Sequence, residues 1–231
     1  MRIIEPSFEI LTEIDGDKIL KYLEKIGKVC YKSESTITED SAQQFIKSII
    51  LRGHESVIEH VSITVRVNCD RGVVYEIIRH RLASYSQSST RYCNFSKDKF
   101  GNEITVINPF FWECEDYKRE YCECMAGIRV CSNCEKYKIW EETMEYVEEQ
   151  YMRLIRSGAT AQEARTILPN SLETEIVITM NLREWRHFFK LRTSQEAHPQ
   201  MREISIPILE EFKRKLPIIF DDIKKKIDDK Q

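Results

Sequence analysis

The sequence is poor in the residues that interrupt regular structure. It has only 7 glycines and 6 prolines in 231 residues, which excludes collagen-like and Gly/Pro-rich low-complexity chains. Its apolar runs are a few residues long, whereas a membrane-spanning helix needs roughly 20 consecutive apolar residues. Hydrophobic residues make up 42% of the chain and charged residues 32%. We therefore expect a soluble globular protein with substantial helix.

The sequence also lacks a large excess of either charge: it has 35 basic and 38 acidic residues, and its formal net charge is -3. Broad nonspecific binding to nucleic acid needs a basic face, so we predict no nucleic-acid partner and no membrane partner. The first residues, MRIIEPSFEILTEIDG, are acidic where a signal peptide has its apolar centre, so we expect a cytoplasmic protein. The 8 cysteines are then expected to be reduced.

Three common catalytic signatures are missing. No Gly-x-Ser-x-Gly elbow surrounds a serine, as a serine hydrolase of the α/β type would require. No Walker-type or Rossmann-type glycine-rich loop is present, so the common nucleotide-binding folds are not indicated. In GHESVIEH, His54 and His60 are six residues apart, whereas two zinc ligands on one helix face are four apart. A zinc protease is therefore not predicted.

Apolar periodicity predicts both helices and strands. Helical spacing covers residues 15–33, 38–53, 137–158, 161–169, 181–194 and 199–217, with Thr38 and Gly53 as the expected caps of the second helix. Period-two alternation predicts strands over 60–68, 103–109 and 173–181 and near the amino terminus. We predict an α/β protein of the α+β type, with a central, mostly antiparallel sheet flanked by helices. It forms one domain, 1–231, with a cysteine-rich insertion at about 112–137.

One stretch, IIRHRLASYSQSSTRYC at 77–93, gathers cations and hydroxyls in a loop after a predicted helix that Asp70 can cap. Arg79, Arg81 and Arg91 suit a phosphorylated small molecule, because guanidinium groups bind phosphate in bidentate fashion and serine hydroxyls add donors. Alternatively, cations at a helix end favourably face the carboxyl-terminal dipole without any ligand. Composition alone leaves both interpretations open.

The spacing within this stretch carries a resemblance to a known family. The pattern Arg-His-Arg-x-x-Ser-x-x-x-x-Ser-x-Arg, formed by Arg79, His80, Arg81, Ser84, Ser89 and Arg91, resembles the signature of the flavin-dependent thymidylate synthases. GHESVIEH, EARTILP and NLREWRHFFKLRTSQEAHPQ resemble other segments of that family. The resemblance implies methylation of dUMP to dTMP, with methylenetetrahydrofolate supplying the carbon and FAD, reduced by NADPH, supplying the hydride. It also implies a homotetramer with active sites shared between subunits.

The resemblance also implies roles for individual residues. It assigns FAD contacts to Ser56, Arg79, His80, Arg81, Gln87, Asn181, Leu182, Arg183 and His187, and places His54 and His198 near the flavin. It assigns dUMP to Glu76, Ile77, Ile78, Arg79, Gln87, Ser88, Ser89, Thr90, Arg91 and Arg165. Arg192 is the implied catalytic residue, placed against the pyrimidine, where it can stabilise negative charge as the N3 proton is lost. No metal is expected there. Ser86-Gln87 replaces the Asn-Glu of many members, so an amide stands where a carboxylate is usual.

Two further points concern the cysteines and the aromatics. Cys114, Cys122, Cys124, Cys131 and Cys134 lie within a short span, and its Cys-x-Cys followed by Cys-x-x-Cys could supply four thiolates to zinc. An insertion with reduced thiols explains the same residues and is favoured over zinc. The competing hypothesis is accordingly a noncatalytic nucleotide- or RNA-binding module with a zinc-bound knuckle. No cysteine lies in the segments that match the active site, so no thiolate nucleophile is expected. Trp185, Phe188 and Phe189 fall on one apolar helix face and are predicted to be core.

Overall fold

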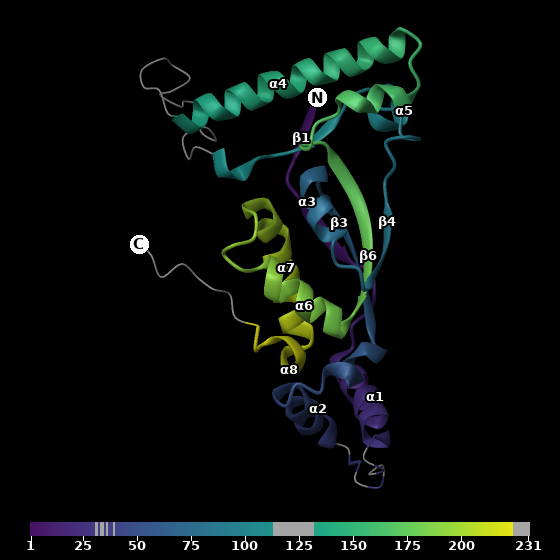
Figure 1. Ribbon diagram of the computed structural model, residues 1–231, viewed down its shortest axis with the longest axis vertical. Coiled ribbons are helices and arrows are strands. Elements are labelled where there is room, and N and C mark those ends of the chain that lie inside the picture. The colour runs from purple at the N-terminus through teal and green to yellow at the C-terminus, as the bar shows by residue number, and fades with distance from the viewer. Residues whose placement is uncertain (31, 33–34, 36, 39, 113–131, 224–231) are drawn as a thin grey trace. The chain divides into compact units, whose positions relative to one another are not determined.

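The computed structural model describes residues 1–231 except 31, 33–34, 36, 39, 113–131 and 224–231. Its strands are β1 (Arg2–Ile4), β2 (Ser7–Ile10), β3 (Ser62–Asp70), β4 (Ala83–Gln87), β5 (Thr105–Ile107) and β6 (Glu173–Asn181) (Figure 1). Its α-helices are α1 (Gly16–Val29), α2 (Ser41–Leu51), α3 (Arg71–Ile77), α4 (Ser132–Arg156), α5 (Ala161–Ala164), α6 (Leu182–Arg192), α7 (Pro199–Lys215) and α8 (Pro217–Phe220). Short 3-10 helices include η2 (Glu55–His60), η3 (Asp98–Phe100) and η5 (Arg165–Ile167).

Four strands form an antiparallel sheet in the order β2-β3-β6-β4, flanked by helices. The strand predicted from alternation is β3, in which Ile63, Val65 and Val67 are buried and the residues between them are not. Strand β6 begins and ends at the predicted residues. A separate pair is parallel, with Arg2 opposite Thr105 in β1 and β5. The predicted α+β fold class is confirmed.

The chain divides into two compact units, each made of stretches that are separate in sequence. Unit 1 consists of Met1–Pro6, Asn68–Tyr75 and Gln87–Glu175, and unit 2 of Ser7–Val67, Glu76–Ser86 and Ile176–Gln231. The single domain expected from the sequence remains a prediction. Most of the expected insertion lies outside the described residues, and helix α4 begins at Ser132 rather than at 137.

Unit 1 has its own hydrophobic core under the long helix α4. Tyr137, Trp140 and Met144 come from one face of α4 and pack with Ile104, Val106 and Leu172. The indole nitrogen of Trp140 donates to Ser171 Oγ at 3.1 Å, which satisfies its one polar group. The amino group of Met1 pairs with Glu148, a residue of α4, at 2.8 Å. These contacts tie the amino-terminal strand to the helix.

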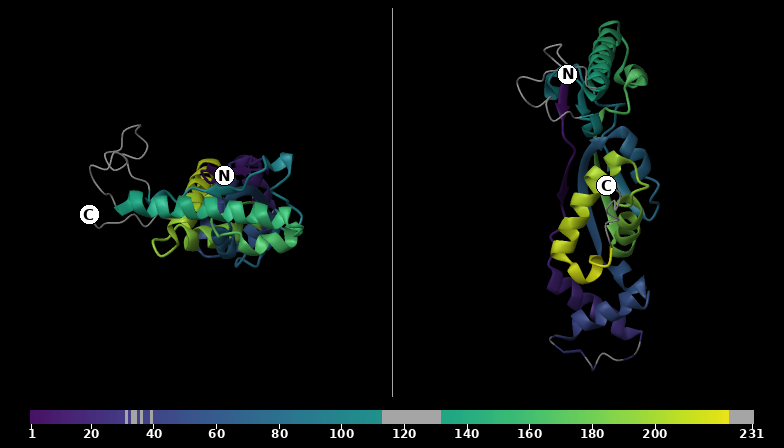
Figure 2. Two further views of the ribbon diagram at one scale, coloured as in Figure 1. Left: turned by 90° about the horizontal axis from the view of Figure 1, so that it is seen from above. Right: turned by 90° about the vertical axis from the view of Figure 1, so that its left-hand side faces the viewer.

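Unit 2 is built around an aromatic core. Trp185, Phe188, Phe189, Phe212 and Phe220 are buried and contact one another at ring-centroid distances of 5.1 to 5.8 Å. They come from α6, α7 and α8, the green and yellow helices of Figures 1 and 2. The predicted core role of the α6 aromatics is confirmed. Trp185 also donates to the carbonyl of Ile63 in β3 at 3.0 Å, so α6 is anchored to the sheet.

One local prediction needs correction, and one segment has a structure that the periodicity did not indicate. Helix α2 has Asp40 as its N-cap rather than Thr38, although Gly53 follows its end with a φ of 72°, as a glycine after a helix should. Within GHESVIEH, Glu55–His60 forms the 3-10 helix η2 shortly before β3, and its Val57 and Ile58 are buried.

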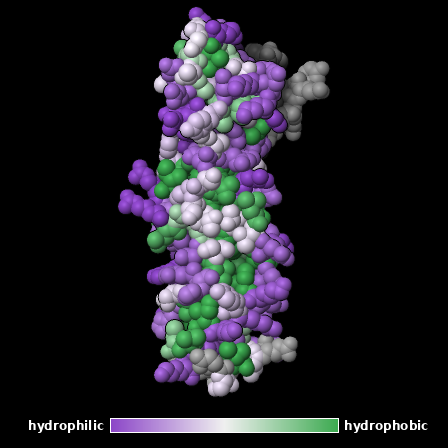
Figure 3. Space-filling view, turned by 90° about the vertical axis from the view of Figure 1, so that its right-hand side faces the viewer, coloured by the Kyte–Doolittle hydropathy of each residue, from purple (hydrophilic) through white to green (hydrophobic). Residues whose placement is uncertain are grey.

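The surface mixes apolar and polar side chains on the face drawn in Figure 3. Among the apolar side chains that stay uncovered, Leu82 is 74% exposed and Ile78 is 41% exposed. Both flank the Arg-His-Arg motif. No helix in the described part of the chain is long and apolar enough to cross a membrane.

Candidate functional site

The Arg-His-Arg motif follows the end of α3. Asp70 accepts a hydrogen bond from the backbone N–H of Val73 at 2.9 Å, so the predicted cap is confirmed. After the helix ends at Ile77, the chain turns and places His80 inside, 3% exposed, while Arg79 and Arg81 stay exposed. These two arginines have no carboxylate partner among the described residues. Their guanidinium groups are therefore available to an anion.

His80 is the centre of a buried polar network in unit 2. Its Nδ1 lies 3.0 Å from Glu184 Oε1, and its Nε2 lies 3.1 Å from Arg192 Nε. Arg192 also donates to Glu76, at 2.7 Å to the carboxylate and 2.9 Å to the backbone carbonyl. Arg192 thus contacts both Glu76 and His80, although each lies more than 100 positions before it in the sequence.

Burial lowers the pKa of His80, and the nearby Arg192 cation acts in the same direction. The hydrogen bond that His80 donates to Glu184 opposes this shift but does not overcome it. His80 is therefore neutral at pH 7. The hydroxyl of Tyr85 lies 2.6 Å from the His80 carbonyl and 2.8 Å from that of Ile77, and burial raises the pKa of Tyr85 to about 12. Tyr85 remains a hydrogen-bond donor that closes the turn.

A pocket of about 530 Å³ opens at the start of α6. Its lining includes the predicted cofactor residues Asn181, Arg183 and His187, together with the exposed Leu82. The side chain of Asn181 accepts from the backbone N–H of Glu184 at 2.9 Å and so caps α6. Arg183 pairs with Glu59 at 2.5 Å. Leu182 is buried, so any ligand contact from this residue comes from its backbone.

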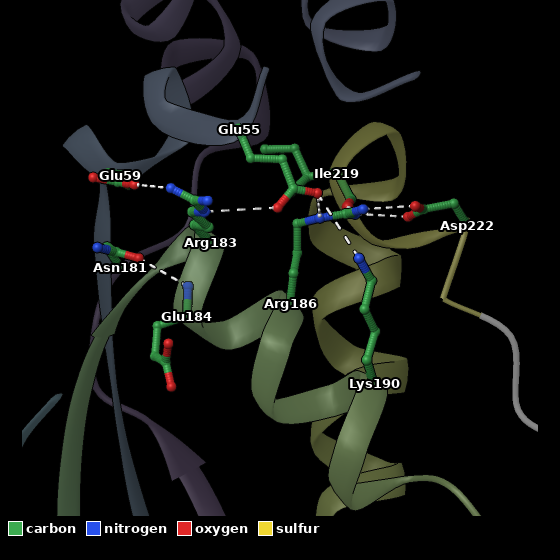
Figure 4. Close-up of polar contacts among 9 residues, drawn as sticks. All are labelled: Glu55, Glu59, Asn181, Arg183, Glu184, Arg186, Lys190, Ile219 and Asp222. Atoms are coloured by element: carbon green, nitrogen blue, oxygen red, sulfur yellow. Dashed lines mark hydrogen bonds and ion pairs between the residues drawn. The ribbon is translucent and has the colours of Figure 1, made fainter. Parts of the chain in front are cut away.

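A second polar network lies beside this pocket and is drawn in Figure 4. Arg186 is 2% exposed and donates to Glu55 at 3.0 Å and to both carboxylate oxygens of Asp222 at 2.6 Å. It also donates to the carbonyl of Ile219. Glu55 also forms an ion pair with Lys190, at 3.8 Å. The guanidinium therefore holds η2, α6 and the segment after α8 together.

A second group of predicted ligand residues, Gln87 to Arg91 and Arg165, lies in unit 1. Ser88 Oγ and Gln87 Nε2 bond to Thr174 Oγ1 at 2.9 and 3.1 Å, and Ser89 Oγ accepts from the backbone N–H of Arg91 at 3.3 Å. Ser88 and the buried Thr90 line a cavity of about 310 Å³.

The cavity in unit 1 has mixed charge. Arg2 and Lys99 line it, and so does Glu173, whose pKa burial raises, with a smaller push from Glu175. Arg91 lies 5.6 Å from the ring of its neighbour Tyr92. Arg165 is the first residue of η5 and is exposed, with no carboxylate partner in the described part of the chain. Hydroxyls and unpaired guanidinium groups are thus both present in unit 1.

The remaining predicted residues are placed as follows. Ile77 is buried and Ile78 is partly exposed at the end of α3. Ser56 is exposed on η2, His54 precedes η2, and His198 is the N-cap of α7. Of the clustered cysteines, Cys134 lies in the first turn of α4, while Cys114, Cys122, Cys124 and Cys131 lie outside the described residues. The zinc hypothesis therefore stays untested.

One group of described residues has ligand atoms close enough together to hold a metal ion. The nearest ligand atoms of His80, Glu184 and His187 all lie within 4.8 Å of one another. However, both ring nitrogens of His80 already have hydrogen-bond partners. Hydrogen bonding therefore accounts for the buried pair without a metal.

Sequence reasoning missed Glu184, Tyr85, Glu55 and Arg186. A signal existed for Glu184, because the stretch from Asn181 to Glu184 has the Asn-x-x-Glu spacing of a helix start. Glu55 and Arg186 contact each other across 131 positions of sequence. Tyr85 bonds to the nearby carbonyls of Ile77 and His80, but no local pattern distinguishes it from an ordinary strand residue.

Comparison with known proteins decides the family. A family model described as thymidylate synthase complementing protein matches residues 14–218. A flavin-dependent thymidylate synthase of Pyrococcus furiosus is 32% identical over 199 residues, which cover 86% of this chain and 71% of that protein. The chain belongs to the flavin-dependent thymidylate synthase family. Proteins of that name from Mycobacterium avium and Geobacter sulfurreducens are 32% and 30% identical, covering 91% and 85% of this chain and 81% and 78% of their own lengths.

Family membership confirms the resemblance found in the sequence and the predicted enzyme class. The matched span contains every residue to which the resemblance assigns a role, from His54 to His198. The individual roles of these residues remain predictions.

Proposed function

We propose that this chain methylates dUMP to dTMP, with methylenetetrahydrofolate as carbon donor and FAD, reduced by NADPH, as hydride carrier. The observation that carries the proposal is the family match together with the arrangement of its signature, in which His80 is buried and Arg79 and Arg81 are exposed. A flavin cofactor follows from the family. We also propose that the protein acts in the cytoplasm as a homotetramer with shared sites.

The residues of unit 2 fit a dinucleotide flavin in chemical type. Arg79 and Arg81 present unpaired guanidinium groups suited to a pyrophosphate, and the exposed Leu82 and Ile78 offer apolar surface to a ring system. Arg183 and His187 add donors in the adjacent pocket. When bound, the flavin supplies the hydride chemistry, which no protein side chain can provide.

The residues of unit 1 fit a nucleotide phosphate. Ser88 and Ser89 carry hydroxyl donors, and Arg91 and Arg165 are exposed cations. Arg192, in unit 2, is proposed to face the pyrimidine. A guanidinium at that position stabilises negative charge on the base and so favours attack by the carbon that is methylated.

Tritium release from 5-tritiated dUMP tests the proposal directly. Purified full-length protein, supplied with FAD, NADPH and methylenetetrahydrofolate, should release tritium to water and form dTMP, and omission of any one component should stop both. The Arg192→Ala protein is the matched control, because it should still bind flavin while losing turnover. A wild-type protein that binds no FAD, or that turns over no dUMP with all components present, would contradict the proposal. Binding of RNA by such a protein would favour the noncatalytic alternative.

A further inference from the structure

Arg192 is held from two sides. Its Nε–H donates to His80 Nε2, and one N–H on each terminal nitrogen donates to Glu76. A guanidinium has five N–H donors, so two remain for a ligand. The direction in which these two point depends on the acceptors that hold the other three.

The contact with His80 fixes the tautomer of the imidazole. Arginine only donates hydrogen bonds, so His80 Nε2 must present a lone pair. The single ring proton of neutral His80 then lies on Nδ1, where Glu184 Oε1 accepts it at 3.0 Å. The opposite tautomer would place two N–H groups against each other at Arg192 and a lone pair against a carboxylate at Glu184.

We propose that Glu184 is a positioning residue for Arg192 and acts through His80. The expected effect on substrate rests on the proposed function, whereas the tautomer is a property of the protein without ligands. Glu184 holds the ring proton on Nδ1, so that Nε2 keeps an acceptor aimed at Arg192. The guanidinium is thereby oriented before any ligand arrives, which lowers the cost of binding and of charge stabilisation.

Helix α6 presents Glu184 and Arg192 to the His80 ring from one face. Glu184, Phe188 and Arg192 are spaced four residues apart, and residues at this spacing share one face of a helix. The His80 ring contacts all three: Nδ1 meets Glu184, Nε2 meets Arg192, and the ring packs edge-on against Phe188 at a centroid distance of 4.9 Å. His80 and Glu184 are 3% and 7% exposed, so water competes little for these hydrogen bonds.

The tautomer can be read from histidine labelled with ¹⁵N in the ring, by solid-state NMR, which molecular size does not limit. The chain has 5 histidines, and the His80→Gln protein assigns the signal. Wild-type protein should carry the His80 proton on Nδ1. Arg192→Ala protein should keep it there, because Glu184 alone suffices. Adding Glu184→Leu to Arg192→Ala should move the proton to Nε2. A proton on Nε2 in Arg192→Ala, or on Nδ1 in the double variant, would overturn the proposal.

Turnover gives a second readout. Glu184→Leu should lower kcat/KM for dUMP by about 10- to 100-fold, as for other partners that orient a functional imidazole, while Glu184→Gln should stay within about threefold because its amide oxygen still accepts from Nδ1. Glu24→Leu removes a carboxylate that is equally buried, in α1 of the same unit, and should leave turnover unchanged. Equal losses in Glu184→Gln and Glu184→Leu would count against positioning. A wild-type protein without synthase activity would contradict the proposed function but leave the tautomer result standing.

Discussion

Replacing Arg186 by methionine tests whether the buried guanidinium of Figure 4 holds unit 2 together. Methionine keeps most of the apolar stem and removes only the charged end, so packing changes little. The substitution removes two hydrogen bonds to Asp222, one to Glu55 and one to the carbonyl of Ile219. What it costs depends on how far each of these acceptors can find another partner.

Breaking a fully buried ion pair by removing one partner costs about 3–5 kcal/mol. The figure must be reduced here, because Asp222 is 48% exposed and returns to water, and because Glu55 retains Lys190 at 3.8 Å. A buried carbonyl that loses its donor, as at Ile219, costs about 1–3 kcal/mol. We therefore expect Arg186→Met to lower the free energy of unfolding by about 2–3 kcal/mol, below the fully buried range.

Urea unfolding at fixed protein concentration measures this loss, and an m-value of about 2–3 kcal/mol/M converts it to a midpoint shift of about 1 M. Lys190→Met is the matched control, since it removes a cation from the same Glu55 but from a half-exposed position; such pairs contribute about 0–1 kcal/mol. Equal shifts in the two variants, or a change below about 0.5 kcal/mol for Arg186→Met, would refute the assignment of the guanidinium as a structural clamp.

Three other predictions concern Asp222, Gly16 and Arg165. Burial alone would raise the pKa of Asp222, but the hydrogen bond and charge of Arg186 bring it below its usual 3.8. The contribution of Asp222 to stability is thus full above about pH 5 and is lost as the pH falls through the lowered pKa. Asp222→Asn should therefore flatten the dependence of the unfolding free energy on pH in this acidic range. Gly16→Ala should destabilise by about 1–3 kcal/mol despite alanine's helix propensity, because the new Cβ would lie 2.6 Å from the backbone oxygen of Lys215; unchanged thermal unfolding would contradict this. Arg165→Gln should raise KM for dUMP with little change in kcat, if Arg165 binds only the phosphate; steady-state kinetics would show the reverse pattern if it acts in the chemical step.

Local patterns predicted the elements well where one physical signal dominates. The alternation in β3, the cap by Asp70 and the bounds of β6 depend on residues adjacent in sequence. Thr38 and Asp40 are both good caps by residue type, so residue type alone does not choose between them. The two units could not be read from the sequence, because each is assembled from three separate stretches and no linker composition marks the crossings.

The sequence singled out the arginines and the histidine of the candidate site but not the residues that support them. The signature motif identified Arg79, His80 and Arg81, and the structure exposes the arginines and buries the histidine. Glu184 and Arg186 face inward from α6, where an unaided hydrophobicity pattern treats them as solvent-facing charges. Buried charges are rare unless they are paired, and their partners Glu55, Asp222 and His80 lie on other elements.

The arginines of unit 2 fall into two classes that composition alone cannot separate. Arg186 and Arg192 are bound to carboxylates in partly or fully buried positions, so their charge is committed to the fold or to a fixed orientation. Arg79 and Arg81 are exposed and have no carboxylate partner among the described residues, so they can meet an anion without breaking an ion pair. Arg183 is intermediate, because a phosphate would have to replace Glu59, now at 2.5 Å. Net affinity for an anion should therefore come mainly from Arg79 and Arg81, with Arg183 contributing less than its charge suggests.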